Sequence, residues 1–295
     1  RRRRGSTRLA GRRGVSFTTL VDAATLAAHL DDPLWQVVDV RHQLADPGYG
    51  ERAYAAGHIP GAVFLHCDRD LSGPQNGRNG RHPLPDPAVL AARLGAVGIG
   101  PATQVVVYDD AQGMIAGRLW WLLRWLGHDR VAVLDGGLQA WQAASGILTD
   151  VQPTLQPVTF PLRQGCRPVA ADDLLERLES PQLHLVDARA AERFRGDVEP
   201  LDPVAGHIPG AVNRFFGLNL QADGRFKPAA ELRAEWLGVL AGAAPEDVVH
   251  QCGSGVSACH NLLAMEVAGL PGSCLYAGSW SEWCADPGRP VARGA

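Results

Sequence analysis

The sequence predicts an α/β protein made of two tandem domains, each a doubly wound parallel sheet flanked by helices. The main observation is an internal repeat, because the eight residues AGHIPGAV occur at 56–63 and again at 205–212. A hydrophobic stretch that ends in Asp-x-Arg precedes both copies, at residues 37–41 and 185–189. Such an identity with ordered flanks indicates a duplicated unit of about 140 residues.

Short apolar strands alternate with helices along the second unit. Strands that are apolar throughout and separated by helices are typical of a parallel sheet buried on both faces. Ligands of such sheets bind at the carboxyl ends of the strands. We expect strands at residues 183–187, 247–251 and 273–276, and helices at residues 172–179, 231–240 and 257–268 and from Ser281 onward.

A proline-rich segment separates the two units. Residues 149–166 contain three prolines and Pro168 follows them, a density that favours an extended linker over a helix or strand. We therefore expect a first domain at residues 15–148 and a second at residues 167–295. Residues 1–14 form a basic tail that we expect to be disordered.

Charge and hydropathy exclude two classes of function. The net charge is −3, and residues 1–13 carry seven arginines and no acid, so the rest of the chain carries −10. A nucleic-acid-binding body would be basic, so we expect no nucleic-acid partner. Arg118 and Arg124 interrupt the apolar stretch at 114–126, and no run approaches the roughly 20 apolar residues of a membrane span. We therefore expect no membrane partner.

The six cysteines do not form a recognisable metal or disulfide pattern. They lie at positions 67, 166, 252, 259, 274 and 284, without any CxxC pair. This spacing gives no support to a zinc-ribbon or thioredoxin-type site. We expect free thiols in a reducing cytoplasm, with no metal and no cofactor, and most of the cysteines should be small buried hydrophobic residues.

Cys252 is the exception, because it opens a glycine-rich loop directly after an apolar strand. The loop contains Gly253, Ser254, Gly255, Val256 and Ser257, and a helix is expected to follow. Two glycines let successive N–H groups point inward, and this cradle together with the helix N-terminus stabilises an anion. We therefore expect Cys252 to be a thiolate nucleophile.

The duplication gives an internal control for this interpretation. Alignment of the two units places Asp110 of the first unit where Cys252 stands, so the first unit should be catalytically inactive and should shape the cleft. Phosphatases have a similar loop with an Arg six residues after the Cys, which binds phosphate. Here that position is Ala258, so a phosphatase is disfavoured.

These residues resemble the rhodanese superfamily, specifically the tandem-domain sulfurtransferases. The resemblance rests on the paired AGHIPGAV motifs, the loop at 252–258 and the ending at 278–283, and it covers about residues 15–291. It implies that Cys252 takes a sulfane sulfur as a persulfide and passes it to a thiol or to cyanide. The N–H groups of residues 253–257 would stabilise the persulfide anion.

The loop chemistry also implies a donor. Thiosulfate enzymes of the family generally have an Arg-Lys pair after the Cys, whereas the neutral Gly253-Ser254 resembles the 3-mercaptopyruvate type. The family's donor-binding Arg matches Arg193, with Arg189 nearby, but Asp202 occupies the position of a second Arg. Thiosulfate:cyanide transfer and a protein-fed sulfur relay with little small-molecule activity therefore remain alternatives. The acceptor and the oligomeric state stay open.

The family further implies a proton relay of a loop Ser, a His and an acid. These map to Ser254 and to His58 of the first repeat, with Asp46 or Glu51 as the acid. His207 occupies the same place in the second repeat, so a purely structural role for this His is the competing interpretation. Residues 68–70 and 78–81 are expected to form a solvated loop that could line the cleft.

Overall fold

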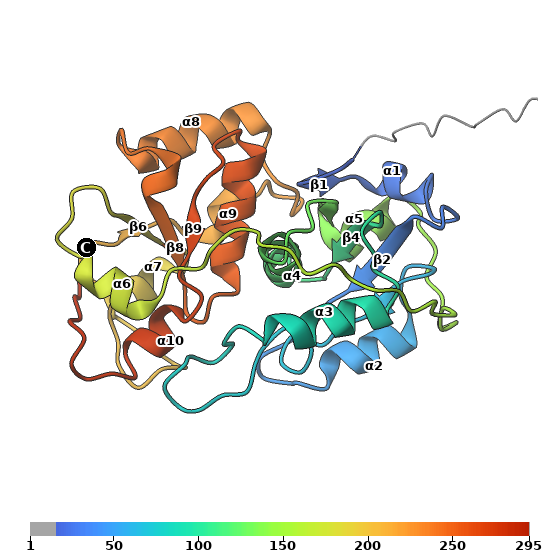
Figure 1. Ribbon diagram of the computed structural model, residues 1–295. Helices are drawn as coiled ribbons and strands as arrows, with labels where there is room; N and C mark the ends of the chain where they lie inside the picture. The colour runs from blue at the N-terminus through green and yellow to red at the C-terminus, as the bar shows by residue number, and fades with distance from the viewer. Residues whose placement is uncertain (1–15, 295) are drawn as a thin grey trace, which may run out of the picture.

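The computed structural model describes residues 16–294 and contains two parallel β-sheets, one in each half of the chain (Figure 1). Neighbouring strands in both sheets run parallel, as the apolar, helix-separated strands predict. The first sheet has the order β1-β5-β4-β2-β3 and the second β7-β6-β8-β9. The strands are β1 (Leu20–Val21), β2 (Trp35–Asp39), β3 (Val63–Phe64), β4 (Gln104–Tyr108), β5 (Val131–Leu134), β6 (His184–Asp187), β7 (Val212–Asn213), β8 (Val248–Gln251) and β9 (Cys274–Leu275).

Helices flank both sheets and begin where the local sequence favours it. Asp86 caps α3 by accepting hydrogen bonds from the N–H groups of Ala88 and Val89, and Pro87 occupies the first turn. The first domain contains α1 (Ala23–Ala27), α2 (Tyr49–Ala56), α3 (Pro87–Ala96), α4 (Met114–Trp125) and α5 (Gly137–Ala143). The second contains α6 (Ala171–Glu176), α7 (Ala191–Arg195), α8 (Ala229–Leu240), α9 (Ser257–Val267) and α10 (Ser279–Trp283), with 3₁₀ turns η1 (Phe216–Asn219) and η2 (Pro245–Asp247).

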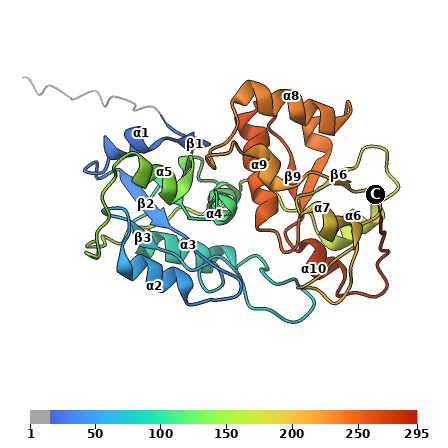
Figure 2. The same ribbon diagram turned by 180° about the vertical axis from the view of Figure 1, so that it is seen from behind.

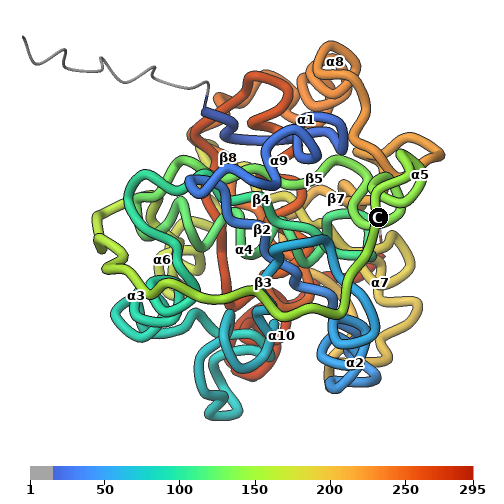
Figure 3. Tube along the Cα trace, turned by 90° about the vertical axis from the view of Figure 1, so that its right-hand side faces the viewer, coloured from blue at the N-terminus to red at the C-terminus, as the bar shows by residue number. Residues whose placement is uncertain are grey.

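The segment between α5 and α6 has no helix or strand and runs along the first domain before it reaches the second (Figure 3). The Val158 N–H donates to the Gly95 carbonyl at 2.9 Å, and the Arg163 N–H donates to the Leu126 carbonyl at 3.1 Å. Phe160 is buried. The proline-rich stretch is therefore extended and fixed to the surface of the first domain rather than free.

Helices α4 and α9 join the two domains (Figures 1 and 2). A Cβ at Gly117 of α4 would lie 3.3 Å from the backbone nitrogen of His260 in α9, so glycine allows this close approach. One hydrophobic core includes Leu119 and Trp120 from α4 and Leu263 from α9. The carboxyl ends of both sheets are thereby held at fixed positions relative to each other.

Among residues 16–294, no helix combines the length and apolar character that crossing a bilayer requires.

Candidate active site

Cys252 lies at the carboxyl end of β8, the position that the sequence predicts for the site. Its side chain is 2% exposed, and the N–H of Gly255 donates to its Sγ at 3.2 Å. Gly255 has a φ of +77°, and a Cβ there would overlap the carbonyl oxygen of Ala277. The Trp280 and Ser281 N–H groups at the start of α10 donate to the carbonyls of Cys252 and Gly253. The loop is therefore tightly fixed around the thiol.

A cavity of about 220 Å³ opens beside Cys252 and is formed by both domains. Arg193 and Ser254 line it from the second domain, and Arg81 and His82 line it from the first. Phe215 and Phe216 contribute apolar wall. A compartment of this size fits a small molecule placed against the sulfur.

Ser254 belongs to a chain of three side chains that crosses the domain boundary. Its Oγ lies 2.7 Å from Nδ1 of His82, and Nε2 of His82 lies 3.2 Å from Oδ1 of Asp68. A carboxylate can only accept, so Nε2 donates to Asp68 and Nδ1 accepts from the Ser254 hydroxyl. The hydrogen bond from His82 lowers the pKa of Asp68, against the opposing effect of burial. Ser254, His82 and Asp68 thus form a hydrogen-bonded chain of the type that can act as a proton relay.

The structure places His58 apart from this chain of side chains and outside the set of residues that line the cavity. Nδ1 of His58 is 2.8 Å from the Tyr54 carbonyl, and Nε2 is 3.2 Å from the Val151 carbonyl. His207 makes the equivalent contact in the second domain, with Nδ1 2.8 Å from the Phe194 carbonyl. Both histidines hold the repeat to the chain beside it, which explains why the two copies share them.

The two acids suggested as partners of His58 are likewise outside the relay. Asp46 pairs with Arg52 and Glu51 pairs with Arg69, and all four side chains are substantially exposed. The sequence signal that would have found the true pair is the stretch from His66 to His82. This irregular segment contains two histidines and two aspartates, whereas the shorter connection after the second copy of the repeat, residues 214–228, contains no histidine.

Arg189 lines the cavity, but its charge is already used in an ion pair. Its guanidinium contacts the carboxylate of Asp187 at 2.7 Å and donates to the Gly206 carbonyl at 2.8 Å. Arg41 makes the same two contacts in the first domain, with Asp39 and Gly57. Arg189 is therefore part of a framework that both domains share.

Arg193 on α7 does reach the nucleophile loop, and Arg81 of the first domain accompanies it. A Cβ built on Gly253 would lie 2.9 Å from Nη2 of Arg81 and 3.4 Å from Nη1 of Arg193. Two guanidinium groups therefore converge on the residue next to the nucleophile. The sequence places Arg81 only in a loop that could line the cleft, because nothing in the sequence shows which side of the loop faces the second domain.

Two buried carboxylates orient these guanidinium groups. Asp202 bonds to Arg81 and lies 3.4 Å from Arg193, while Glu199 bonds to Arg193 at 2.7 Å. Burial raises the pKa of Asp202, and Arg81 opposes that effect. The position where the family has a second Arg is thus occupied by an acid that holds an Arg from the other domain.

The acid that replaces the nucleophile in the first domain is Asp109, not Asp110. Asp39 pairs with Tyr108 in the first sheet, whereas Asp187 pairs with Gln251 in the second, so the residues that follow, Asp109 and Cys252, are equivalent. The first residue of each following helix, in α4 and α9, lies five positions later. The sequence alignment was off by one because two aspartates are adjacent.

Asp109 fills the cradle that Cys252 leaves open. Its carboxylate accepts hydrogen bonds from four backbone N–H groups at 2.8 to 2.9 Å, those of Ala111, Gly113, Ile115 and Ala116. Burial raises the pKa of Asp109, and the four donors oppose that shift by stabilising the anion. The same loop shape therefore binds an internal anion in the first domain.

Arg118 ties the nucleophile loop to the relay. It lies in α4 and is fully buried, and its guanidinium donates to the Gly255 carbonyl at 3.2 Å and to the His82 carbonyl at 3.0 Å. In the sequence, Arg118 is visible only as a charged residue that interrupts an apolar stretch. A charged residue inside an otherwise apolar helix is itself a signal, because burial of a charge requires specific partners.

Side chains with metal-ligating atoms also gather in the cavity. The donor atoms of His42, Cys67, Asp68 and His82 all lie within 4.8 Å of one another. His42, Cys67 and His82 are buried, and each of them lines the cavity that holds Cys252.

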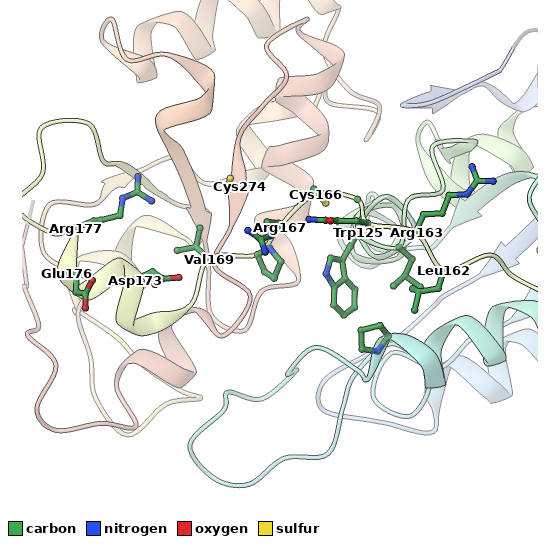
Figure 4. Close-up of a pocket in the computed structure, with 15 residues that line it drawn as sticks. Trp125, Leu162, Arg163, Cys166, Arg167, Val169, Asp173, Glu176, Arg177 and Cys274 are labelled. Atoms are coloured by element: carbon green, nitrogen blue, oxygen red, sulfur yellow. The ribbon is translucent and has the colours of Figure 1, made fainter.

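A larger hollow of about 970 Å³ lies away from the nucleophile, along the linker (Figure 4). Trp125, Arg163 and Arg167 line it together with Cys166 and Cys274. No residue of the loop at 252–257 lines this hollow. Burial raises the pKa of Cys274, and neither Cys166 nor Cys274 opens a glycine-rich loop, so the smaller cavity around Cys252 is the candidate active site.

The Rhodanese-like domain family matches this chain twice, at residues 22–144 and 170–286. A probable 3-mercaptopyruvate sulfurtransferase of Pseudomonas aeruginosa is 52% identical over 287 residues, which cover 95% of this chain and all of that one. A putative thiosulfate sulfurtransferase of Mycobacterium tuberculosis is 42% identical over 290 residues, covering 93% and 97%.

A solved structure agrees with these sequence matches. The crystal structure of the 3-mercaptopyruvate sulfotransferase SseA from Escherichia coli superposes with a TM-score of 0.75 at 34% identity, covering 90% of this chain and 99% of that chain. The two matched stretches include the Cys252 loop and the Asp109 loop. The chain belongs to the rhodanese family, with two rhodanese-like domains in tandem.

Proposed function

We propose that this protein is a sulfurtransferase that takes sulfur from 3-mercaptopyruvate as a Cys252 persulfide and delivers it to a thiol or to cyanide. The observation that carries the proposal is the placement of Cys252 beside the relay of Ser254, His82 and Asp68 in one small cavity. The relatives named as 3-mercaptopyruvate sulfurtransferases support this donor.

The first step is attack of the Cys252 thiolate on the sulfur of the donor. An S–S bond forms and the donor's C–S bond breaks, so the bonding electrons leave with the pyruvate enolate. The enolate must then gain a proton to become pyruvate. The Ser254 hydroxyl would give its proton to the enolate and regain one from Nδ1 of His82. For this step His82 would carry a proton on both ring nitrogens, with the Asp68 carboxylate stabilising the charge.

The donor carboxylate would bind to Arg193 and Arg81, which converge on Gly253. An Arg fork matches the geometry of a carboxylate. Asp202 and Glu199 hold the two forks in orientation, so little side-chain entropy is lost when the donor binds. Arg81 thereby supplies, from the first domain, the second cation that the second domain lacks.

The second step transfers the outer sulfur from the persulfide to a thiolate or cyanide and regenerates the Cys252 thiolate. Between the two steps the persulfide anion needs stabilisation. The N–H of Gly255, which already donates to Sγ of Cys252, supports the proposal that the loop supplies it. The first domain has Asp109 in the equivalent loop, so we propose that it carries no sulfur itself.

The test is the intact mass of the protein after incubation with each donor, together with cyanide turnover. Wild type should gain one sulfur atom from 3-mercaptopyruvate, and Cys252→Ser should gain none. Cys259→Ser is the matched control, because Cys259 is also buried and lies in the helix α9 that follows the Cys252 loop. A sulfur gain that survives in Cys252→Ser would contradict the proposal. No gain from any small donor would point to a protein-fed relay.

Thiosulfate is the second candidate donor, and a specific observation favours it. Two guanidinium groups beside the nucleophile suit a dianion as well as a monoanion, and one relative is named as a putative thiosulfate sulfurtransferase. A larger kcat/KM for thiosulfate than for 3-mercaptopyruvate, with cyanide as acceptor, would establish this alternative.

The thiols support a reducing compartment such as the cytoplasm. All six cysteines are free, including the exposed Cys166. A persulfide carrier needs its nucleophile reduced, and the cytoplasm keeps thiols in that state.

A further inference from the structure

A cluster of metal-ligating side chains lies beside the relay and is only partly used by it. Nε2 of His42 lies 3.8 Å from Oδ1 of Asp68, and Nε2 of His82 lies 3.2 Å from the same oxygen. The Cys67 thiol completes the group, and every donor atom is within 4.8 Å of the others. The relay employs His82 and Asp68, whereas His42 and Cys67 have no part in it.

A second, independent observation is that a buried nitrogen of His42 has no hydrogen-bond partner among the described residues. The residue is 5% exposed, and its Nε2 is buried without a hydrogen bond to any described residue. A buried polar atom without a partner carries a free-energy cost of about 1–3 kcal/mol. This nitrogen points toward the carboxylate of Asp68 from just beyond hydrogen-bonding distance, where an atom bound between the two groups would satisfy it.

We propose that His42, Cys67, Asp68 and His82 form a binding site for a zinc ion. Two imidazoles, one thiolate and one carboxylate make a tetrahedral donor set that Zn²⁺ prefers. Ligand atoms around one Zn²⁺ are about 3 to 4 Å apart, given bond lengths of about 2.0 to 2.3 Å. The most widely separated donor atoms, up to 4.8 Å apart, would therefore move closer by roughly 1 to 2 Å to close around the ion. Binding displaces the Cys67 thiol proton to solvent, because thiolate is the ligand form.

Zinc binding and sulfur transfer exclude each other at this site. A zinc ion bound to Nε2 of His82 replaces the proton that this nitrogen donates to Asp68, and the Asp68 carboxylate becomes a ligand of the ion. His82 then keeps Nδ1 toward Ser254 but can no longer pass a proton along the chain. Zinc is thus a reversible inhibitor that acts on the relay and leaves Cys252 untouched. This consequence rests on the proposed function, whereas the site itself does not.

Metal binding is tested first with Co²⁺, which reports its ligands by absorption. The Cys252→Ser protein should bind one Co²⁺ per chain and show both a thiolate-to-cobalt charge-transfer band and the visible bands of tetrahedral coordination. The double variant Cys252→Ser/Cys67→Ser should lose the charge-transfer band, while Cys252→Ser/Cys259→Ser should keep it. A band that requires Cys252 instead of Cys67, or no binding at all, would overturn the proposal.

Zn²⁺ affinity provides a second readout that does not depend on the thiol or on activity. Titration calorimetry with Zn²⁺ should show His42→Asn binding at least tenfold more weakly than wild type. The matched control is His29→Asn, because His29 lies in the first domain on the turn after α1 and is absent from the cluster. Equal affinity in His42→Asn and wild type would overturn the site even if Cys67→Ser failed to fold.

Inhibition is measured last, as turnover against free Zn²⁺ with a chelator reversal. With turnover expressed relative to each protein's own zinc-free rate, His42→Asn should require at least tenfold more Zn²⁺ than wild type for half inhibition. Failure of the proposed function would appear as absent turnover with the Co²⁺ bands intact. Failure of the zinc site would appear as normal turnover without those bands, so the two outcomes are distinguishable.

Discussion

The two domains end their central strand in loops of the same form, but one loop is filled and the other is open. In the first domain, the Asp109 carboxylate accepts four backbone N–H hydrogen bonds. In the second, the residue at this place is Cys252, and one N–H donates to its sulfur. The same loop shape can therefore bind a carboxylate of the protein itself, as in the first domain, or surround a thiol on which the reaction creates an anion, as in the second.

The framework around the two loops is otherwise retained. Asp39 and Arg41 bond to each other and to the Gly57 carbonyl, and Asp187 and Arg189 repeat this arrangement with Gly206. We propose that features shared by both domains maintain the fold, and that side chains found at the site in the second domain alone carry the chemistry. This criterion assigns function to Cys252, Ser254 and Arg193, and a structural role to Arg189, His58 and His207.

The comparison predicts its largest effect at Cys252. We expect Cys252→Ala to lower kcat/KM by at least ~10⁴-fold, because the nucleophile is lost. The free energy of unfolding should change by about 1 kcal/mol or less, since only one small buried side chain is altered. Steady-state kinetics and urea unfolding measure the two quantities. A large loss of stability would show that the second loop also has a structural duty.

Asp109 should show the reverse pattern. Asp109→Ala leaves four buried N–H groups without an acceptor, so we expect a loss of about 3–5 kcal/mol in the free energy of unfolding. Asp109→Asn keeps one acceptor oxygen and should lose less. Urea unfolding followed by tryptophan fluorescence measures both. Wild-type stability in Asp109→Ala would refute the role of an internal anion.

Substitutions of His82 and His58 should likewise separate an effect on catalysis from an effect on stability. His82→Asn breaks the relay, so kcat with 3-mercaptopyruvate should fall about 10²- to 10⁴-fold. His58→Asn breaks contacts with the Tyr54 and Val151 carbonyls and should mainly lower stability. Measuring kcat and unfolding for both variants decides the assignment. A kcat loss in His58→Asn at unchanged stability would return the relay to the repeat motif.

The fold and the nucleophile could be predicted from sequence because their signals are local. The repeated AGHIPGAV motif shows the duplication, and the strand into the glycine loop shows Cys252. The relay could not be found in this way. His82 and Asp68 lie in an irregular segment of the first domain, and they meet Ser254 only because α4 packs on α9.

The ion-pair partners of the arginines could not be predicted from the sequence either. The sequence does not show that Arg189 pairs with Asp187 and Glu199. Arg81 lies more than a hundred residues before Asp202, and no spacing rule links them. The offset between Asp109 and Asp110 has the same origin, because only strand register distinguishes adjacent identical residues.

The effect of Asp202 on KM shows how readily the second loop admits an anionic donor. Its buried carboxylate lies between Arg81 and Arg193, so it competes with a donor carboxylate for the same guanidinium groups. Asp202→Asn keeps an acceptor for Arg81 and removes the charge. We expect KM for 3-mercaptopyruvate to fall about tenfold, which corresponds to about 1.4 kcal/mol, with kcat little changed.

The pH dependence of KM sharpens this last expectation. Because burial raises the pKa of Asp202, its carboxyl takes up a proton at a higher pH than an exposed aspartate does. Protonation removes the competing charge, so KM of the wild type should fall as the pH is lowered. Asp202→Asn lacks that charge at every pH and should lose this part of the dependence. A KM that rises in Asp202→Asn would mean that the carboxylate positions Arg81 and Arg193 more than it competes for them.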